Sequence, residues 1–312
     1  MDLQHSVPSQ ILLSGASGML GSAIDRTLQQ KGVKTLRLVR GEPKAANELR
    51  WNPSAPGGDL DVTRLRELEG LTAAIHLSGA NVSTHRWTTA YKRDMEESRV
   101  GTTQVLAEAL ARLKTPPAVF VSASAVGFYG NRGEEVLDET SSAGSGYFPD
   151  LCQAWEAAAQ SAADAGIRVV HPRFGVVLGS EGGALARLIP LFKMGLGGKL
   201  GNGCQWMSWI SEADAVAAVL FAIENDAITG AFNASAPNPV TNAELTRQLG
   251  HALHRPTIMT APAFALRLVF GEMADEALLS STRTLPRRLI AAGFRFTHPD
   301  LHSAIAAALV KN

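Results

Sequence analysis

The sequence predicts an α/β fold, in which helices cover both faces of a doubly wound parallel sheet and a smaller α/β lobe follows toward the C-terminus. Two observations lead to this fold class. Short apolar runs, typical of buried parallel strands, alternate with longer stretches of helical periodicity. From about residue 182 the composition changes, and glycines become frequent in the segment 195–203. The first pattern indicates one large sheet, and the second marks a separate lobe.

The overall composition is that of a globular protein with balanced charge. The chain has 312 residues, of which 46% are hydrophobic, and its formal net charge is +0. This balance gives no general affinity for nucleic acid or for anionic membranes. The two cysteines, Cys152 and Cys204, lie far apart in the sequence, which favours a reducing compartment over a disulfide scaffold. Because no apolar run is long enough for a membrane span or a signal peptide, we expect a cytoplasmic protein.

The first predicted strand leads into the clearest functional signal. The apolar residues Ile11, Leu12 and Leu13 precede a glycine-containing turn and then a helix. Glycines at such a junction allow a tight turn and a close backbone approach to a pyrophosphate, whose charge the helix N-terminus stabilises. The glycines are spaced by three and three instead of two and three, but their context favours a dinucleotide (Rossmann) site over a turn without ligand. The expected cofactor-binding residues are Gly15, Ser17, Gly18, Met19, Leu20 and Gly21.

The end of the second predicted strand, 35–39, favours NADP(H) over NAD(H). An acidic residue there would bind the adenosine ribose hydroxyls, whereas an arginine suits the extra phosphate of NADP(H). The residue at this position is Arg40, and no Asp or Glu occurs between Arg26 and Glu42. A solvated loop charge is the alternative for Arg40. We expect Arg40 to bind the cofactor, because the acidic residue is missing and the arginine is present.

Three later predicted strands, near 73–77, 118–121 and 169–170, alternate with helical stretches near 88–113 and 151–165. Ligands of a doubly wound sheet bind outside the carboxyl ends of its strands, so the residues that follow these runs are candidates. For each serine, a turn hydroxyl without ligand is the alternative. The cofactor-binding candidates are Leu77, Ser78, Gly79, Ala80, Ser122 and Arg173, and Ser124 is a catalytic candidate.

The second lobe is expected to hold the substrate. We place a dinucleotide-binding domain at 1–173, to which strands of the second lobe can return, and a smaller substrate lobe at 174–312, ending in a helical segment at 262–312. The glycines of 195–203 are typical of a lid that closes on ligand, with a permanently packed loop as the alternative. Polar groups among aromatic residues are typical of small-molecule pockets. The expected substrate-binding residues are Asn81, Gln205, Trp206 and Trp209.

Together these motifs resemble the extended short-chain dehydrogenase/reductase superfamily. They are the three-glycine turn, Leu77-Ser78-Gly79-Ala80, Ser122-Ala123-Ser124 with Phe128-Tyr129-Gly130, and Pro172-Arg173-Phe174-Gly175. Further segments resemble an atypical subgroup, labelled NAD-dependent epimerase or cell division inhibitor homologues, over nearly the whole chain. These are Gly79-Ala80-Asn81, Arg86-Trp87, Ser98-Arg99, Gln205 to Ile210 and Asn233 to Asn242. The resemblance implies a Rossmann fold with a small C-terminal domain of unknown role.

The chain departs from the superfamily at the catalytic dyad. Typical members carry Tyr-x-x-x-Lys, in which the tyrosine transfers a proton and the lysine lowers its pKa and holds the nicotinamide ribose. Aligning Glu156 with the glutamate that often follows the lysine places Phe148 and Cys152 at the dyad positions. Neither replaces the dyad, because phenylalanine has no acidic proton and cysteine carries no cation. Tyr147 is displaced from the tyrosine position by one residue.

Two functional hypotheses follow. The first is an NADP(H)-binding oxidoreductase or epimerase-like enzyme that acts on an unidentified small molecule, in which Ser124 polarises a carbonyl or hydroxyl and Tyr129 transfers the proton. The second is a catalytically degenerate protein that senses NADP(H) or acts as a scaffold. Histidines spaced three or four apart, such as His298 and His302, lack the further ligand of a zinc-protease pattern, so no metal site is expected.

Overall fold

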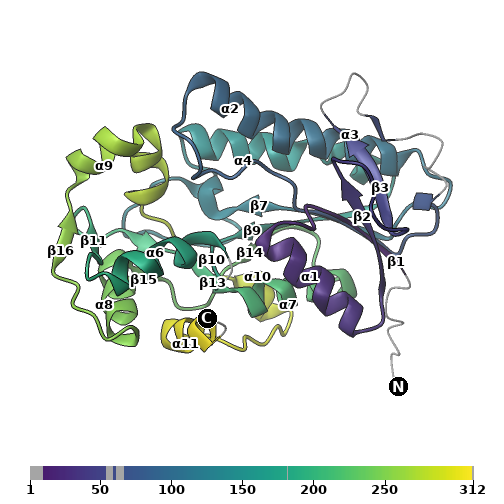
Figure 1. Ribbon diagram of the computed structural model, residues 1–312. Helices are drawn as coiled ribbons and strands as arrows, with labels where there is room; N and C mark the ends of the chain where they lie inside the picture. The colour runs from purple at the N-terminus through teal and green to yellow at the C-terminus, as the bar shows by residue number, and fades with distance from the viewer. Residues whose placement is uncertain (1–9, 54–58, 61–66, 181, 311–312) are drawn as a thin grey trace.

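The computed structural model describes residues 10–53, 59–60, 67–180 and 182–310 (Figure 1). Within them, the central sheet has the strand order β14-β9-β6-β5-β1-β2-β3-β4, and the short β7 also pairs with β9. All neighbours are parallel except β3 and β4, which confirms the predicted parallel sheet. The strands are β1 Gln10–Ser14, β2 Lys34–Val39, β3 Glu48–Asn52, β4 Asp59–Leu60, β5 Ala73–His76, β6 Val119–Ser122, β7 Ser124–Ala125, β9 Arg168–Phe174 and β14 Gly230–Ala234.

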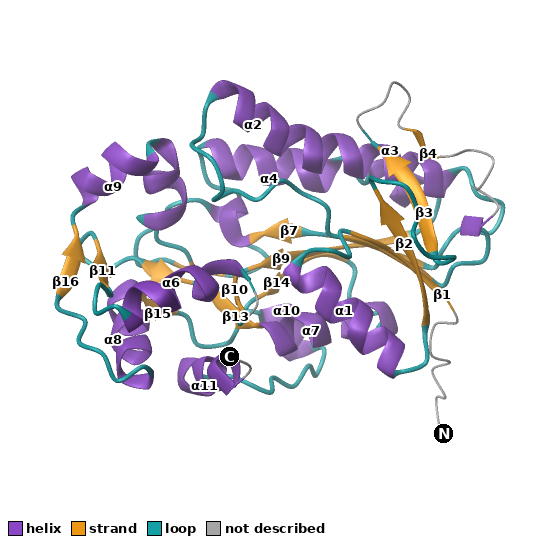
Figure 2. Ribbon diagram, viewed as in Figure 1, coloured by secondary structure: helices purple, strands orange, loops and turns teal. Residues whose placement is uncertain are grey.

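Helices cover both faces of this sheet, as the continuous apolar strands require (Figure 2). Ile11 and Leu13 of β1 point into a core that one layer of helices covers, and Leu12 points into the core on the opposite face. All three side chains are 0% exposed. The first layer contains α1 Met19–Gln30 and α7 Glu212–Glu224, and the second contains α3 Thr102–Ala111 and α5 Gln160–Asp164. The fold is therefore doubly wound.

The strand order places a topological switch point between β1 and β5. From β1 the chain first builds β2 and β3 on one side, and it then returns to build β5, β6, β9 and β14 on the other. Crossovers on opposite faces leave a crevice at the carboxyl ends of the two strands where the order reverses. The glycine turn follows β1, and Leu77 follows β5, so both expected cofactor segments meet at this crevice.

The helices that lie between β5 and β9 in the sequence differ in detail from their predicted spans. The stretch predicted near 88–113 divides into α2 Thr89–Glu96, a π-helical turn Glu97–Gly101 and α3. The stretch predicted near 151–165 begins earlier, as α4 Tyr147–Ala157, and then continues as α5. Hydrophobic spacing predicts where a helix buries a face, but it does not resolve such local changes of winding.

The C-terminal half builds a smaller lobe with a core of its own, at the left in Figure 1. Its strand pairs are β10 with β13, β11 with β16 and β12 with β15, while β17 pairs with β8. The strands are β8 Val136–Leu137, β10 Val176–Leu178, β11 Gly198–Leu200, β12 Trp206–Met207, β13 Trp209–Ser211, β15 Val240–Thr241, β16 Met259–Ala261 and β17 Arg283–Thr284. The helices are α6 Gly183–Lys193, α8 Asn242–Ala252, α9 Ala263–Phe270, α10 Arg287–Ala291 and α11 Leu301–Val310, with a second π-helical turn at Ala274–Leu278. None of the described helices is long and apolar enough to cross a membrane.

Candidate functional site

The glycine turn after β1 is packed so closely that side chains do not fit. Gly15 has a positive φ of 73°, and a Cβ there would lie 2.8 Å from the carbonyl oxygen of Leu77. A Cβ on Gly21 would lie only 2.1 Å from the carbonyl oxygen of Gly15. The Gly18 amide also donates to that oxygen at 3.0 Å. These contacts account for glycine at 15 and 21, and they bring the turn against the end of β5.

The N-terminus of α1 opens onto the same crevice. Gly18, the N-cap residue, offers no side chain to cap the helix, and the first turn contains no acidic residue. Ser17 and Gly18 are exposed, whereas Met19 and Leu20 are partly buried. Uncapped amides and the positive end of the helix dipole are suited to binding a phosphate group.

A loop of the second lobe closes against this helix start. A Cβ on Gly179 would lie 2.6 Å from the Met19 sulfur, and one on Gly182 would lie 3.1 Å from the Met19 Cβ. Gly179 and Gly182, which follow β10, therefore lie against the first residue of α1. The sequence did not predict that Gly179 and Gly182 contribute to the site, although glycines at 179, 182 and 183 are a signal of close packing.

One arginine lies within β2, and another, Arg40, directly follows it. Of these two, Arg40 is the one that remains available to a ligand. Arg37 pairs with Glu48 at 3.0 Å and approaches Asp25 at 3.7 Å. Arg40 is exposed, and it has no ion-pair partner within the described part of the chain. Its guanidinium is therefore free to bind a phosphate at the expected ribose end of the crevice.

The loop after β5 is ordered by its own hydrogen bonds. Leu77 and Ser78 are partly buried, and Gly79 is exposed. The amide of Ala80 donates to the Ser98 hydroxyl at 2.9 Å. Asn81 is exposed, and its side-chain oxygen accepts from the Ser83 amide and hydroxyl, so it stabilises the turn that follows.

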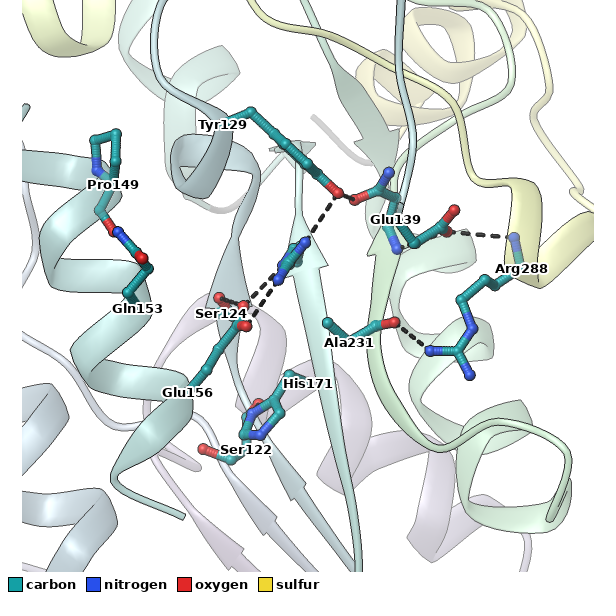
Figure 3. A network of polar contacts seen from close by, with 12 residues as sticks. Ser122, Ser124, Tyr129, Glu139, Pro149, Gln153, Glu156, His171, Ala231 and Arg288 are labelled. Atoms are coloured by element: carbon teal, nitrogen blue, oxygen red, sulfur yellow. Dashed lines mark hydrogen bonds and ion pairs between the residues drawn. The ribbon is translucent and has the colours of Figure 1, made fainter. Parts of the chain in front are cut away.

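Ser124 and Tyr129, the expected catalytic pair, belong to one buried network of polar contacts (Figure 3). The Ser124 hydroxyl donates to Glu156 at 2.7 Å, and Arg173 forms two hydrogen bonds of 2.8 Å to the same carboxylate. Arg173 also donates to the Tyr129 hydroxyl at 3.0 Å, and that hydroxyl donates to Asn233 at 2.8 Å. The network thus connects α4 to β7, β9 and β14.

The side chains of this network are almost completely buried. Ser124 is 2% exposed and Tyr129 is 0% exposed. Burial raises the pKa of Tyr129, which keeps the phenol protonated. Ser122, expected to bind cofactor, is fully buried as well, and its hydroxyl has no hydrogen-bond partner within the described residues. The network stabilises the meeting of four elements beneath the carboxyl edge, and Arg173 lies inside it and away from the surface.

Glu156 and Asn233 complete this network, and sequence reasoning did not single them out as functional. In the sequence, Glu156 only marked where the two dyad positions lie. A signal was available, because an arginine inside a buried strand such as Arg173 requires a carboxylate partner. Asn233 carries no comparable local signal.

The two dyad positions hold groups that do not transfer protons. Phe148 packs edge-on against Trp87, with ring centroids 4.8 Å apart. Cys152 is buried, and burial raises its pKa to about 12. The neighbouring Tyr147 donates to the backbone oxygen of Lys92, and burial raises its pKa to about 12. All three groups are therefore neutral at physiological pH.

The expected substrate-binding residues of the second lobe do not form one wall. Trp209 is fully buried in the core of this lobe and donates to the Asn238 carbonyl, so it does not lie on a ligand surface. The Trp206 indole donates to Glu134 at 2.6 Å. The Gln205 amide donates to the carbonyl oxygens of Leu200 and Leu278, and it therefore connects β11 to the π-helical turn Ala274–Leu278.

The glycine-rich segment 195–203 is packed at its centre. β11 pairs with β16, and a Cβ on Gly198 would lie 1.6 Å from the Met259 carbonyl oxygen. Close backbone contact is thus one reason for glycine at position 198. Lid closure remains a prediction for the segment 195–203. In the described residues, no group of three or more His, Cys, Asp or Glu side chains is placed to hold a metal ion.

Comparisons with known proteins agree with this geometry. Residues 11–235 match the NAD dependent epimerase/dehydratase family, and residues 261–308 match a domain of unknown function (DUF1731). An epimerase family protein of Mycobacterium leprae is 42% identical over 310 residues, covering 99% of this chain and 98% of that protein.

Two solved structures are also similar. The human epimerase family protein SDR39U1 (isoform 2), solved with NADPH, has a TM-score of 0.88 and 30% identity, covering 97% of this chain and 100% of that chain. A nucleoside-diphosphate sugar epimerase from Corynebacterium glutamicum has a TM-score of 0.79 and 35% identity, covering 97% of this chain and 58% of that chain. The resemblance predicted from the motifs is confirmed.

Proposed function

Because the chain belongs to the NAD dependent epimerase/dehydratase family, we propose that it binds NADP(H) at the β1–β5 crevice and transfers hydride between this cofactor and an unidentified small molecule. The glycine turn is the observation that carries the proposal. The contacts around Gly15 and Gly21 exclude any Cβ, and the uncapped start of α1 faces the space that a pyrophosphate requires. The residues present therefore fit a dinucleotide.

Two observations favour NADP(H) over NAD(H). Arg40 is exposed at the end of β2 and has no ion-pair partner in the described part of the chain, so its guanidinium is available to the extra phosphate. In addition, the human relative was solved with NADPH. Charge-assisted hydrogen bonds to this phosphate should favour NADPH by about 1–3 kcal/mol.

The proposed roles of the remaining residues follow from their burial. The bound nicotinamide supplies the hydride chemistry. Tyr129 is held by Arg173 and Asn233, so we assign it to the support of β9 and β14 instead of proton transfer. Ser124 stays our candidate for polarising the reacting carbonyl or hydroxyl, which requires its hydroxyl to turn away from Glu156. The proposed substrate is a small molecule in the cytoplasm.

Titration of NADPH and NADH into the wild type and into Arg40→Ala tests the proposal. We expect the wild type to bind NADPH several-fold more tightly than NADH, and Arg40→Ala to lose most of this preference. Arg112→Ala, which removes an exposed arginine at the end of α3, is the matched control and should keep it. Equal wild-type affinities for the two cofactors would refute the preference, and no binding of either would refute the cofactor site.

A second candidate function is an NADP(H) sensor or scaffold without turnover. The neutral groups at the dyad positions, Phe148 and Cys152, favour it. NADPH consumption should be measured with a panel of aldehydes, ketones and sugar nucleotides. Consumption above the rate without enzyme would support the oxidoreductase, whereas tight NADPH binding with no turnover across the panel would support the sensor.

A further inference from the structure

The π-helical turn Glu97–Gly101 points one arginine at the candidate cofactor site. The Arg99 guanidinium donates to the carbonyl oxygens of Ala80, at 2.9 Å, and Met95, at 3.3 Å. A Cβ on Gly79 would lie 3.1 Å from its central carbon. Arg99 is only partly exposed, and it lies directly under the loop that follows β5.

Among the residues that the structure describes, none provides an acidic partner for the positive charge of Arg99. Within the described part of the chain, its polar contacts are two backbone oxygens and the face of the Trp155 ring, whose centroid is 5.2 Å away. The titratable groups that it faces are the Cys152 thiol and the phenols of Tyr91 and Tyr147. Desolvating a charge without an ionic partner is costly, so such a cation is typical of a binding position.

The guanidinium lies on the Cys152 face of α4. Trp155, over whose ring it stacks, is three residues after Cys152, and residues with this spacing share one face of a helix. Arg99 also lies close enough to Cys152 for its positive charge to oppose the rise that burial causes in the pKa of this thiol. The space that the lysine of typical short-chain dehydrogenases occupies is thus reached by a cation from the neighbouring helical turn.

We infer that Arg99 replaces the missing dyad lysine, and that its guanidinium binds the nicotinamide-side ribose of NADP(H) through N–H donors that the backbone oxygens do not use. This inference rests on the proposed function. It also explains an uncharged residue at 152, since a lysine there would place a second cation beside Arg99. The role is cofactor positioning, because the guanidinium supplies no proton to a substrate.

Cofactor affinity is the direct test. NADPH dissociation constants are measured for the wild type, Arg99→Met and Arg93→Met, the last removing an exposed arginine of α2 as the matched control. Loss of a charge-assisted contact should weaken NADPH binding about tenfold or more in Arg99→Met and leave Arg93→Met unchanged. Thermal unfolding of each variant without cofactor reports any general loss of stability.

Moving the positive charge from residue 99 to residue 152 distinguishes a role in cofactor positioning from a purely structural role. Cys152→Lys alone should lower the melting temperature, because two cations then share one partly buried space. In the double variant Arg99→Met/Cys152→Lys, the lysine should restore NADPH affinity to within about threefold of the wild type. Arg99→Lys, which keeps the charge, should bind NADPH more tightly than Arg99→Met. If Arg99→Met does not fold, Arg99→Lys is compared with the wild type in its place.

The outcomes distinguish the inference from the function on which it rests. Wild-type NADPH binding together with equal affinity in the Arg99 variants would overturn the role of Arg99 and leave the proposed function intact. A lower melting temperature with unchanged affinity would likewise show that Arg99 only braces Ala80 and Met95. Absence of NADPH binding by the wild type would refute the proposed function itself.

Discussion

Glu156 neutralises Arg173 beneath the carboxyl edge of the sheet, and this pair supports the site from below. Their side chains are 15% and 6% exposed, respectively. Removing the carboxylate leaves a buried guanidinium without its partner, so Glu156→Gln should lower the free energy of unfolding by about 3 kcal/mol. Urea unfolding measures this loss. Glu108→Gln breaks an exposed pair with Arg112 and should cost less than about 1 kcal/mol. Equal effects of the two substitutions would contradict a buried, stabilising pair.

A buried histidine makes stability depend on pH. His76 is fully buried, with hydrogen bonds to Ser14 at 2.6 Å and Thr102 at 3.1 Å, and burial lowers its pKa from 6.5 to about 3. Between these values the unfolded chain binds a proton that the folded chain excludes. The free energy of unfolding therefore falls as the pH drops below 6.5, with a slope of up to about 1.4 kcal/mol per pH unit.

Urea unfolding at several pH values between 7 and 4 measures this slope. His76→Asn should reduce it, and His302→Asn, which replaces an exposed imidazole, should leave it unchanged. Burial also lowers the pKa of His171, so part of the slope remains in His76→Asn. An unchanged slope in that variant would assign the whole pH dependence to other groups.

At the scale of elements, the junction of β1 and α1 is the most sensitive point of the proposed site. Gly21→Ala places a Cβ 2.1 Å from the Gly15 carbonyl oxygen, so the helix must move away from the turn. We expect NADPH affinity to fall more than tenfold, since backbone donors at a helix N-terminus act only at short range.

Gly101→Ala provides the matched helical control. A Cβ there meets no atom within 4 Å, and alanine favours the helix over glycine by up to about 1 kcal/mol. NADPH affinity should stay at the wild-type value, and the melting temperature should not fall. Wild-type affinity in Gly21→Ala, measured by isothermal titration, would show that the turn does not hold the cofactor.

The sequence predicted the elements whose signals are local. Buried runs such as Ile11–Leu13 and the glycines beside them depend on neighbours within a few residues, so hydrophobic spacing and turn chemistry identify them. The network of Tyr129 could not be predicted in this way, because its partner Asn233 is 104 residues further along the chain. The same reason applies to Trp209. Aromatic residues beside a glycine-rich loop fit a core and a pocket equally well, and only the fold places this indole among buried side chains.

At the scale of the whole molecule, the chain crosses between its two lobes several times. The sequence places the boundary near residue 173 and allows strands of the second lobe to return to the sheet. In the structure, β14 pairs with β9 in the central sheet, and Val216 and Val219 of α7 cover one of its faces. Arg187 of α6 donates to the Ser83 carbonyl at 2.6 Å and so connects the second lobe to the loop that follows β5. The dinucleotide-binding lobe therefore depends on α7 and β14 to complete one of its two cores.

This interleaving predicts that a chain ending at residue 173 does not fold by itself. Without α7 and β14, one face of the sheet keeps only α1 as apolar cover, and β9 becomes an edge strand. The full chain should melt in one transition, whereas fragment 1–173 should lack both near-ultraviolet circular dichroism and slowly exchanging amides in β5 and β6. Fragment 1–235, which keeps α7 and β14, should recover protection in these two strands. Cooperative melting of fragment 1–173 with a native-like near-ultraviolet spectrum would show instead that the dinucleotide domain folds without the elements that return from the second lobe.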